Sequence, residues 1–146
     1  MHISSKCSIA VHCLLFIYEY GDTRKVTSNL LALSTGTNPV TIRGIISSLK
    51  KDGMISVRSG TGGATLLCPP EEITLYRIYQ ATEPDFLMGL AGLHSSPSPL
   101  CPVGKNIHHV LDCSYRKVRN DLCESLKKIT LENIISDYHH IRHGTG

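Results

Sequence analysis

The chain has 146 residues, a formal net charge of +3, 41% hydrophobic residues and a mean hydropathy of −0.02. These values are typical of a globular protein that forms one domain, or a small domain with an appendage. No apolar run reaches the ~18 residues that a membrane span requires, and the N-terminus lacks a signal-peptide cleavage pattern. We therefore expect a cytoplasmic protein that has no membrane partner.

Positive charge is concentrated in the first half of the chain. Residues 1–70 contain seven Lys and Arg against three Asp and Glu, a net charge of +4, whereas residues 71–146 contain eight against nine, a net charge of −1. A solvated basic surface would explain this by itself, but a basic half-chain is also typical of nucleic-acid binding.

The first 36 residues predict two helices. One begins after a cap at Ser4 or Ser5 and ends near residue 20, and apolar residues cover most of its circumference, which indicates burial on most sides. The second is short, is capped by Thr27 or Ser28 and ends near residue 33. Its leucines are expected to face inward: Leu30, Leu31 and Leu33.

The segment from Thr37 to Gly63 has the pattern of a capped helix followed by a hairpin. Asn38 is a favoured cap, and proline at the next position is tolerated because a first-turn N–H has no partner. A buried stripe follows at helical spacing: Ile42, Ile45, Ile46 and Leu49. After Asp52-Gly53, residues 54–57 predict a strand, 59–63 a glycine-rich tip and 64–68 the return strand.

The second half predicts three further helices around a loose connection. A fourth helix is expected over residues 71–83, a Pro/Gly/Ser-rich loop over 84–104, a long helix over 105–129 and a short one over 131–137. The division is a DNA-binding domain 1–70, a linking region 71–104, a dimerisation region 105–137 and a flexible tail 138–146. The long helix carries a narrow apolar stripe that suits a helix pair: Ile107, Leu111, Val118, Leu122, Leu126 and Ile129. Packing of this stripe on the fourth helix of the same chain is the alternative.

The expected fold is mainly α with a two-stranded β wing, a winged helix-turn-helix followed by a long dimerisation helix. In such folds the third helix enters the major groove of DNA. Arg43 would bond guanine there, or else form a surface salt bridge, and Arg58 would enter a narrow minor groove. The predicted DNA-binding residues are Ser28, Asn38, Pro39, Val40, Thr41, Arg43, Lys50, Arg58, Ser59, Thr61 and Gly62.

Three segments resemble a known family: TNPVTIRGIISSLKKDGMI, VRSGTGGATLL and PPEEITLYRIYQATE. They are similar to the signature segments of the Rrf2 winged-helix regulators, which include IscR and CymR. The resemblance implies a homodimeric transcription factor, usually a repressor, whose long helices cross at the dimer axis. It also implies that Arg58 is the wing arginine and that Gly62-Gly63 are the paired wing glycines. Ser59 and Ala64 depart from the family pattern, which leaves the DNA sequence read open. Cys101-Pro-Val-Gly104 resembles small members that have no assigned iron–sulfur cluster.

Six cysteines without a CxxC pair predict reduced thiols rather than a disulfide framework. The resemblance implies a cluster in many relatives, but here Cys101 and Cys113 are too few and too widely spaced for three close ligands. His108, His109 or an oxygen ligand from the partner chain would complete such a site, or a divalent metal would use His109 with Cys113. Alternatively Cys101, in a loop before a helix, is a redox switch that oxidises onto Cys113 or a partner chain. We expect no cofactor, and the histidine pair to be helix surface.

The sequence thus predicts a homodimeric DNA-binding regulator, most often a repressor, that reads a pseudo-palindromic operator in double-stranded DNA. Thiol redox state, a regulatory protein or a small molecule is the expected signal. The alternatives are a winged-helix module that binds a protein, and a metal- or cluster-sensing regulator. No nucleophile–base pair and no phosphate-binding loop with a following lysine are present, so catalysis is not expected.

Overall fold

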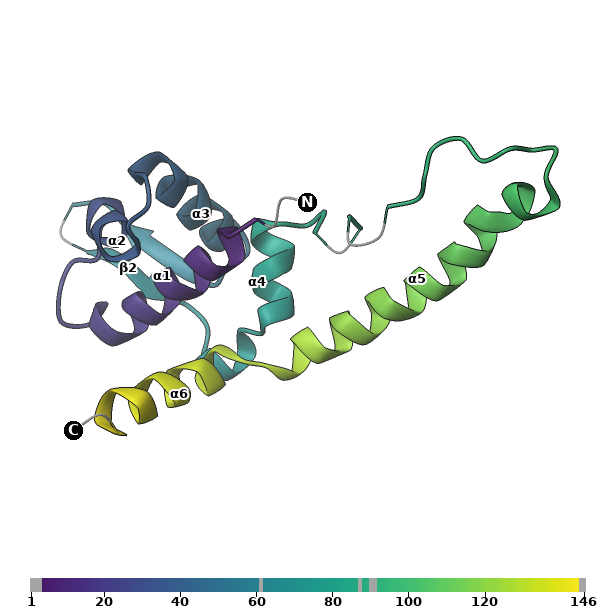
Figure 1. The fold of residues 1–146 in the computed structure, drawn as a ribbon. Helices are drawn as coiled ribbons and strands as arrows, with labels where there is room; N and C mark the ends of the chain where they lie inside the picture. Colours follow the sequence, from purple (N-terminus) through teal and green to yellow (C-terminus); the bar gives the residue numbers. More distant parts are fainter. Residues whose placement is uncertain (1–3, 61, 87, 90–91, 145–146) are drawn as a thin grey trace.

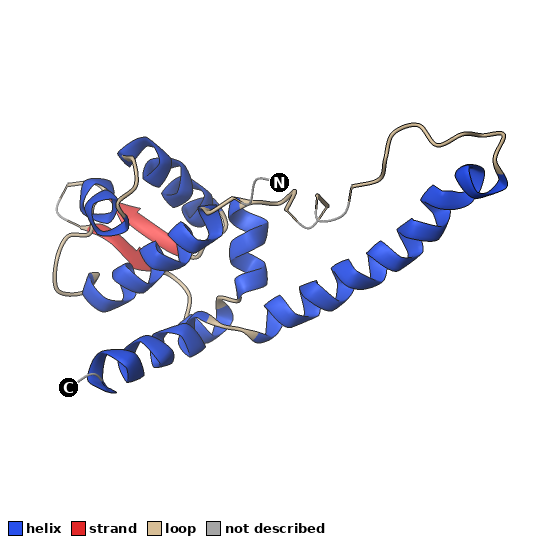
Figure 2. Cartoon of the chain, viewed as in Figure 1, coloured by secondary structure: helices blue, strands red, loops and turns tan. Residues whose placement is uncertain are grey.

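The computed structural model describes residues 4–60, 62–86, 88–89 and 92–144. A compact body holds the first four helices and the wing, and one long helix projects from it (Figure 1). Figure 2 shows the mainly helical architecture with a two-stranded sheet, which confirms the predicted fold class. The elements in chain order are α1 (Lys6–Tyr20), α2 (Ser28–Thr35), α3 (Pro39–Lys51), β1 (Ile55–Arg58), β2 (Gly63–Leu66), the 3₁₀ turn η1 (Pro70–Glu72), α4 (Leu75–Thr82), α5 (Pro102–Lys128) and α6 (Leu131–Gly144).

The core of the body forms where α1, α3 and the sheet meet. The four residues of the α3 stripe are all buried, as predicted: Ile42, Ile45, Ile46 and Leu49. On α2, however, Leu33 is 81% exposed, so its predicted inward orientation is wrong, and Ala32 fills the inner position beside Leu31 instead. Only one narrow face of this short helix packs against the core, so the side chain of Ala32 lies inward and that of Leu33 faces solvent.

Side-chain caps fix the starts of α2 and α3. The Thr27 hydroxyl accepts a hydrogen bond from the Leu30 N–H at 3.2 Å, and Asn38 Oδ1 accepts one from the Val40 N–H at 2.8 Å. Gly36 ends α2 in the left-handed conformation with φ of 64°, which costs glycine little. The Ser5 side chain forms no cap hydrogen bond at the start of α1, but the hydroxyl of Ser4, the other predicted cap, accepts a hydrogen bond from the Lys6 N–H at 3.3 Å.

The wing is an antiparallel hairpin in which Ile55 faces Leu66 and Arg58 faces Gly63. Its return strand is also joined to the segment before α2, because the Ala64 N–H donates to the Val26 carbonyl at 3.0 Å. A Cβ added at Gly63 would lie 2.6 Å from the Val26 nitrogen, and the φ of 68° disfavours other residues. Glycine is therefore required where the wing lies closest to the body.

The predicted fourth helix is broken. Instead of one helix over 71–83, η1 ends at Glu72, Ile73 is extended and buried, and α4 begins after a cap by Thr74. The extended residues form a short antiparallel bridge between Thr74 and Thr130, with the Leu75 N–H bonded to the Ile129 carbonyl at 2.9 Å. Ile129 consequently lies outside α5, since its backbone carbonyl pairs with the body rather than with its own helix.

Helix α6 is longer than the sequence predicts, because residues 138–144 continue the helix beyond the expected end at Asp137. His139 of α6 contacts the carboxylate of Glu19 on α1, and Arg142 lies 3.8 Å from the same carboxylate. This packing explains why the expected frayed end is helical. Among the residues described, no helix is both long and apolar enough to cross a membrane.

Candidate nucleic-acid interface

The face of α3 opposite the buried stripe lies open to solvent. Val40 is 66% exposed, and Asn38, Pro39, Thr41, Arg43 and Lys50 are exposed as well. The side-chain oxygen of Asn38 already caps the helix, so its amide NH₂ is the part that is available for contact. Thr41 and Arg43 lie in the first half of α3, whereas Lys50 lies in its last turn.

Arg43 and Arg58 form neither an ion pair nor a side-chain hydrogen bond within the described part of the chain. The salt-bridge alternative for Arg43 is therefore not seen there. By contrast, Arg77 and Arg116 each donate to an aspartate. A guanidinium without an internal partner keeps all five donors for an external acceptor such as phosphate or a base edge.

The wing and the start of α2 face each other across a cavity of about 210 Å³. Arg58 and Ser59 of the wing line this cavity together with Ser28, the first residue of α2. The structure thus brings together three residues that the sequence placed in separate predicted elements. Thr41 is apart from them and lines a second cavity with Lys6 of α1. Thr61 lies outside the described residues.

Lys25 is a contributor to the wing that sequence reasoning missed. Its ammonium donates a hydrogen bond to the carbonyl oxygen of Gly60 at the wing tip. Gly62 lies against the wing arginine so closely that an added Cβ would be 2.3 Å from the Arg58 Cβ. Sequence patterns could not identify this contact, because its two residues are 35 positions apart and only the tertiary fold brings them together.

Arg77 joins the end of α3 to the strand end and to η1. Its Nε donates to Asp52 Oδ2 at 2.6 Å, Nη2 donates to the Asp52 carbonyl at 3.1 Å and Nη1 lies 3.5 Å from Cys68 Sγ. Burial opposes the charged form, but the hydrogen bonds that Arg77 donates to Asp52 and Cys68 outweigh it and raise the pKa of Arg77. This clamp fixes the base of the wing relative to α3.

The apolar stripe of α5 divides into two parts. Leu126, near the α4 end, is 9% exposed, which agrees with the alternative of packing within the same chain. Val118, farther along, is 58% exposed, and Ile107, Leu111 and Leu122 are partly exposed. Figure 1 shows this outer part of α5 extending beyond the body.

The sequence matches the Rrf2 family, described as iron-dependent transcriptional regulators, over residues 3–137. The chain belongs to the Rrf2 family. Members are DNA-binding regulators rather than enzymes, so the family assignment confirms the predicted class of function.

Relatives agree with this Rrf2 assignment over nearly the whole chain. YwnA of Bacillus subtilis (strain 168), a candidate HTH-type transcriptional regulator, is 34% identical over 134 residues, covering 92% of this chain and 97% of YwnA. A solved structure of a candidate transcriptional regulator from Lactobacillus plantarum is 26% identical with a TM-score of 0.76, and the match covers 98% of each chain. IscR of T. potens is 22% identical with a TM-score of 0.67, covering 94% of this chain and 88% of that chain, which supports the shared fold alone.

The family description raises the question of whether this Rrf2 chain offers ligands for iron. Cys101 precedes the first residue of α5 and Cys113 lies in the same helix, both exposed. Twelve residues of helix place them about 18 Å apart, far beyond the reach of one metal or a disulfide. Within the described ranges, no three His, Cys, Asp or Glu side chains gather as a metal site would require. The donors of a single chain therefore do not fit a cluster, and oxidation of Cys101 onto Cys113 of the same chain is ruled out.

The two histidines proposed as ligands have different surroundings. His108 Nε2 is 2.7 Å from the His94 carbonyl oxygen, and the two imidazole rings lie edge to face at 5.4 Å. His109 is exposed one helical turn before Cys113.

Cys7 and Cys13 are buried, and desolvation raises the pKa of the Cys7 thiol to about 11 and that of Cys13 to about 12. Such thiols stay protonated and unreactive at neutral pH.

Proposed function

We propose that this Rrf2 chain is a homodimeric repressor that reads a pseudo-palindromic operator through α3 and the wing. The observation that carries the proposal is the exposure of Arg43 and Arg58, neither of which has an ionic partner in the described chain. Arg43 supplies a fork of donors to guanine in the major groove, and Arg58 enters the minor groove. The N-terminus of α2 at Ser28, which lines the same cavity as Arg58, binds a phosphate.

Homodimerisation is supported by the outer part of α5. The outer part of α5 lies beyond the body (Figure 1), and Val118 on it is 58% exposed, which suits packing against the matching stripe of a second copy. Two-fold symmetry then places two α3 helices on half-sites a helical turn or more apart. Sedimentation velocity of the native chain and of Val118→Glu tests this: we expect a dimer for the first and a monomer for the second. A native monomer at micromolar concentration contradicts the dimer.

Binding to DNA is tested by selecting genomic fragments and measuring the affinity of the selected site by fluorescence anisotropy over a range of salt. Arg58→Ala should weaken binding most at A·T-rich half-sites and reduce the salt slope by about 1. Lys117→Ala on α5 is the matched control and should change neither the DNA affinity nor the salt slope. A salt-independent affinity, or no selected DNA, contradicts the proposal and favours a protein as the ligand of the winged helix. Transcription from a promoter–reporter fusion distinguishes a repressor from an activator, since deletion of a repressor raises transcription.

Redox modulation rests on Cys101, an exposed thiol at the start of the helix that we propose for dimerisation. Because Cys113 of the same chain is out of reach, the oxidised forms left are a sulfenic acid and a disulfide to another chain. We expect peroxide to change the DNA affinity of the native chain and not that of Cys101→Ser. Equal affinities of both proteins with and without peroxide contradict redox control through this residue.

A further inference from the structure

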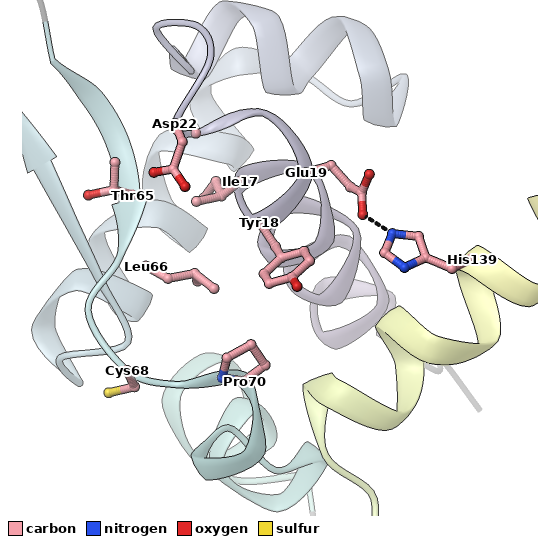
Figure 3. Close-up of a pocket in the computed structure, with 10 residues that line it drawn as sticks. Ile17, Tyr18, Glu19, Asp22, Thr65, Leu66, Cys68, Pro70 and His139 are labelled. Carbon is pink, nitrogen blue, oxygen red and sulfur yellow. Dashed lines mark hydrogen bonds and ion pairs between the residues drawn. The ribbon is translucent and has the colours of Figure 1, made fainter.

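A cavity of about 510 Å³ lies on the body, away from α3 and from the tip of the wing. Its walls come from the end of α1, from β2 and the residues after it, and from α6. Figure 3 shows the Tyr18 ring near the middle of the lining residues, with Asp22 and Thr65 to one side and His139 to the other. The volume lies within the range typical of small-molecule sites.

The lining combines apolar surface with negative charge. Ile17, Leu66 and Pro70 give it apolar surface, Tyr18 adds an aromatic ring, and Glu19 and Asp22 contribute two carboxylates. No lysine or arginine is among the residues that line it. His139 and Cys68 are the other titratable side chains of the wall.

The two carboxylates differ in how they are already used. Glu19 contacts His139 and lies 3.8 Å from Arg142, so its charge is shared with α6. Asp22 forms no ion pair or side-chain hydrogen bond in the described part of the chain. The cavity therefore presents one uncompensated anionic group beside an aromatic and aliphatic surface.

We propose that this cavity is a binding site for a small organic cation. The ammonium group of the ligand pairs with the Asp22 carboxylate, and its apolar portion packs against Tyr18 and Leu66. An aromatic ring adds to the attraction, since ring faces attract cations. Because β2 closes one side of the cavity and α6 the other, the bound ligand contacts both the wing and the C-terminal helices. This inference does not depend on binding to DNA.

The test uses the full chain and three probes of nearly equal shape: 4-methylbenzylamine, neutral 4-methylbenzyl alcohol and anionic 4-methylbenzoate. Titrations followed by amide NMR should show saturable shifts for the amine at residues 17–22 and 65–68. The alcohol should bind more weakly and the carboxylate not at all. Asp22→Asn should weaken binding of the amine by about fivefold, the factor that corresponds to ~1 kcal/mol for an exposed ion pair.

Asp121→Asn is the matched control, because Asp121 is an exposed aspartate on α5 and its loss should leave the amine affinity unchanged. The proposal is overturned if no probe binds, if the alcohol binds as tightly as the amine, if Asp22→Asn binds like the native chain, or if the shifts appear at other residues. An unchanged spectrum of free Asp22→Asn establishes that the variant is folded.

Discussion

The ammonium group of Lys25 donates a hydrogen bond to the carbonyl oxygen of Gly60, so the turn before α2 supports the tip of the wing. Beside it, the Val26 carbonyl accepts the Ala64 N–H at 3.0 Å. The hairpin is therefore attached to the body both at its return strand and near its tip. Isolated two-stranded hairpins are only marginally stable, so we expect these two attachments to stabilise the wing.

Replacing Lys25 by Met should lower DNA affinity about threefold to tenfold, because the wing loses a hydrogen bond from a charged, exposed group. Anisotropy titrations over a range of salt separate two roles. If Lys25 positions the wing, the salt slope stays unchanged, whereas loss of a direct phosphate contact reduces the slope by about 1. Lys105→Met on α5 is the control and should bind DNA like the native chain.

Gly44→Ala should stabilise the fold by about 1 kcal/mol, since glycine is the poorest helix former after proline. A Cβ at this position of α3 meets nothing within 4 Å, so no contact offsets the gain. Urea unfolding measures the change. Gly62→Ala is the informative contrast, because its Cβ would collide with Arg58 and should reduce DNA affinity instead. A destabilised Gly44→Ala would show that α3 needs glycine for a reason within the fold.

Arg77→Met should lower the free energy of unfolding by about 1–2 kcal/mol, because it leaves Asp52 and the Asp52 carbonyl without their donor. Urea denaturation at neutral pH measures the loss. Arg116→Met is the matched variant, since Arg116 pairs with Asp112 one turn away on exposed α5 and should cost less than about 0.5 kcal/mol. Similar losses for both variants would mean that the Arg77 clamp contributes no more than a surface pair.

Stability should fall as pH rises above about 8.5, where unfolded thiols begin to ionise. Burial holds the pKa of Cys7 at about 11 and of Cys13 at about 12, so the folded chain keeps protons that the unfolded chain releases. Burial, with Cys7 and Glu83, also raises the pKa of Tyr79, which acts in the same direction. Each buried thiol then removes up to ~1.4 kcal/mol per pH unit until its folded-state pKa is reached.

Urea unfolding at several pH values between neutral and alkaline measures this slope. Cys13→Ala should be less stable at neutral pH, because it opens a cavity, but should show a shallower slope. A free energy of unfolding that is constant over this range would contradict the protonation of the buried thiols.

Sequence patterns predicted the fold well where local signals agree with the tertiary packing. Helix α3 is such a case, since the Asn38 cap, the proline after it and the four-residue apolar stripe indicate the same start and the same buried face. The break at Ile73 was missed because the apolar residues from Ile73 to Ala81 suit a single helix over 71–83. Only the bridge between Thr74 and Thr130, which are 56 residues apart, selects the extended conformation there.

The sequence indicated the arginines of the candidate site but not the residues that hold the surrounding elements in place. Arg43 and Arg58 were singled out as DNA contacts of the predicted third helix and wing; the structure leaves both exposed, and their contact with DNA stays a prediction. Lys25, Arg77 and His139 act through partners that are distant in the sequence, so no spacing rule identifies them. The polar character of residues 138–144 suggested a flexible end, although the contact between His139 and Glu19 joins α6 to the body.

The bridge between Thr74 and Thr130 places one end of α5 against the body and leaves the other end far from it. With 27 residues, α5 is about 40 Å long at ~1.5 Å per residue. A tilt of about 10° at the bridge therefore displaces the far end by about 7 Å, a fifth of the roughly 34 Å that separates successive major grooves. If α5 pairs with a second copy as proposed, a small adjustment of the backbone at this joint would change the separation of the two α3 helices by an amount comparable to about two base pairs.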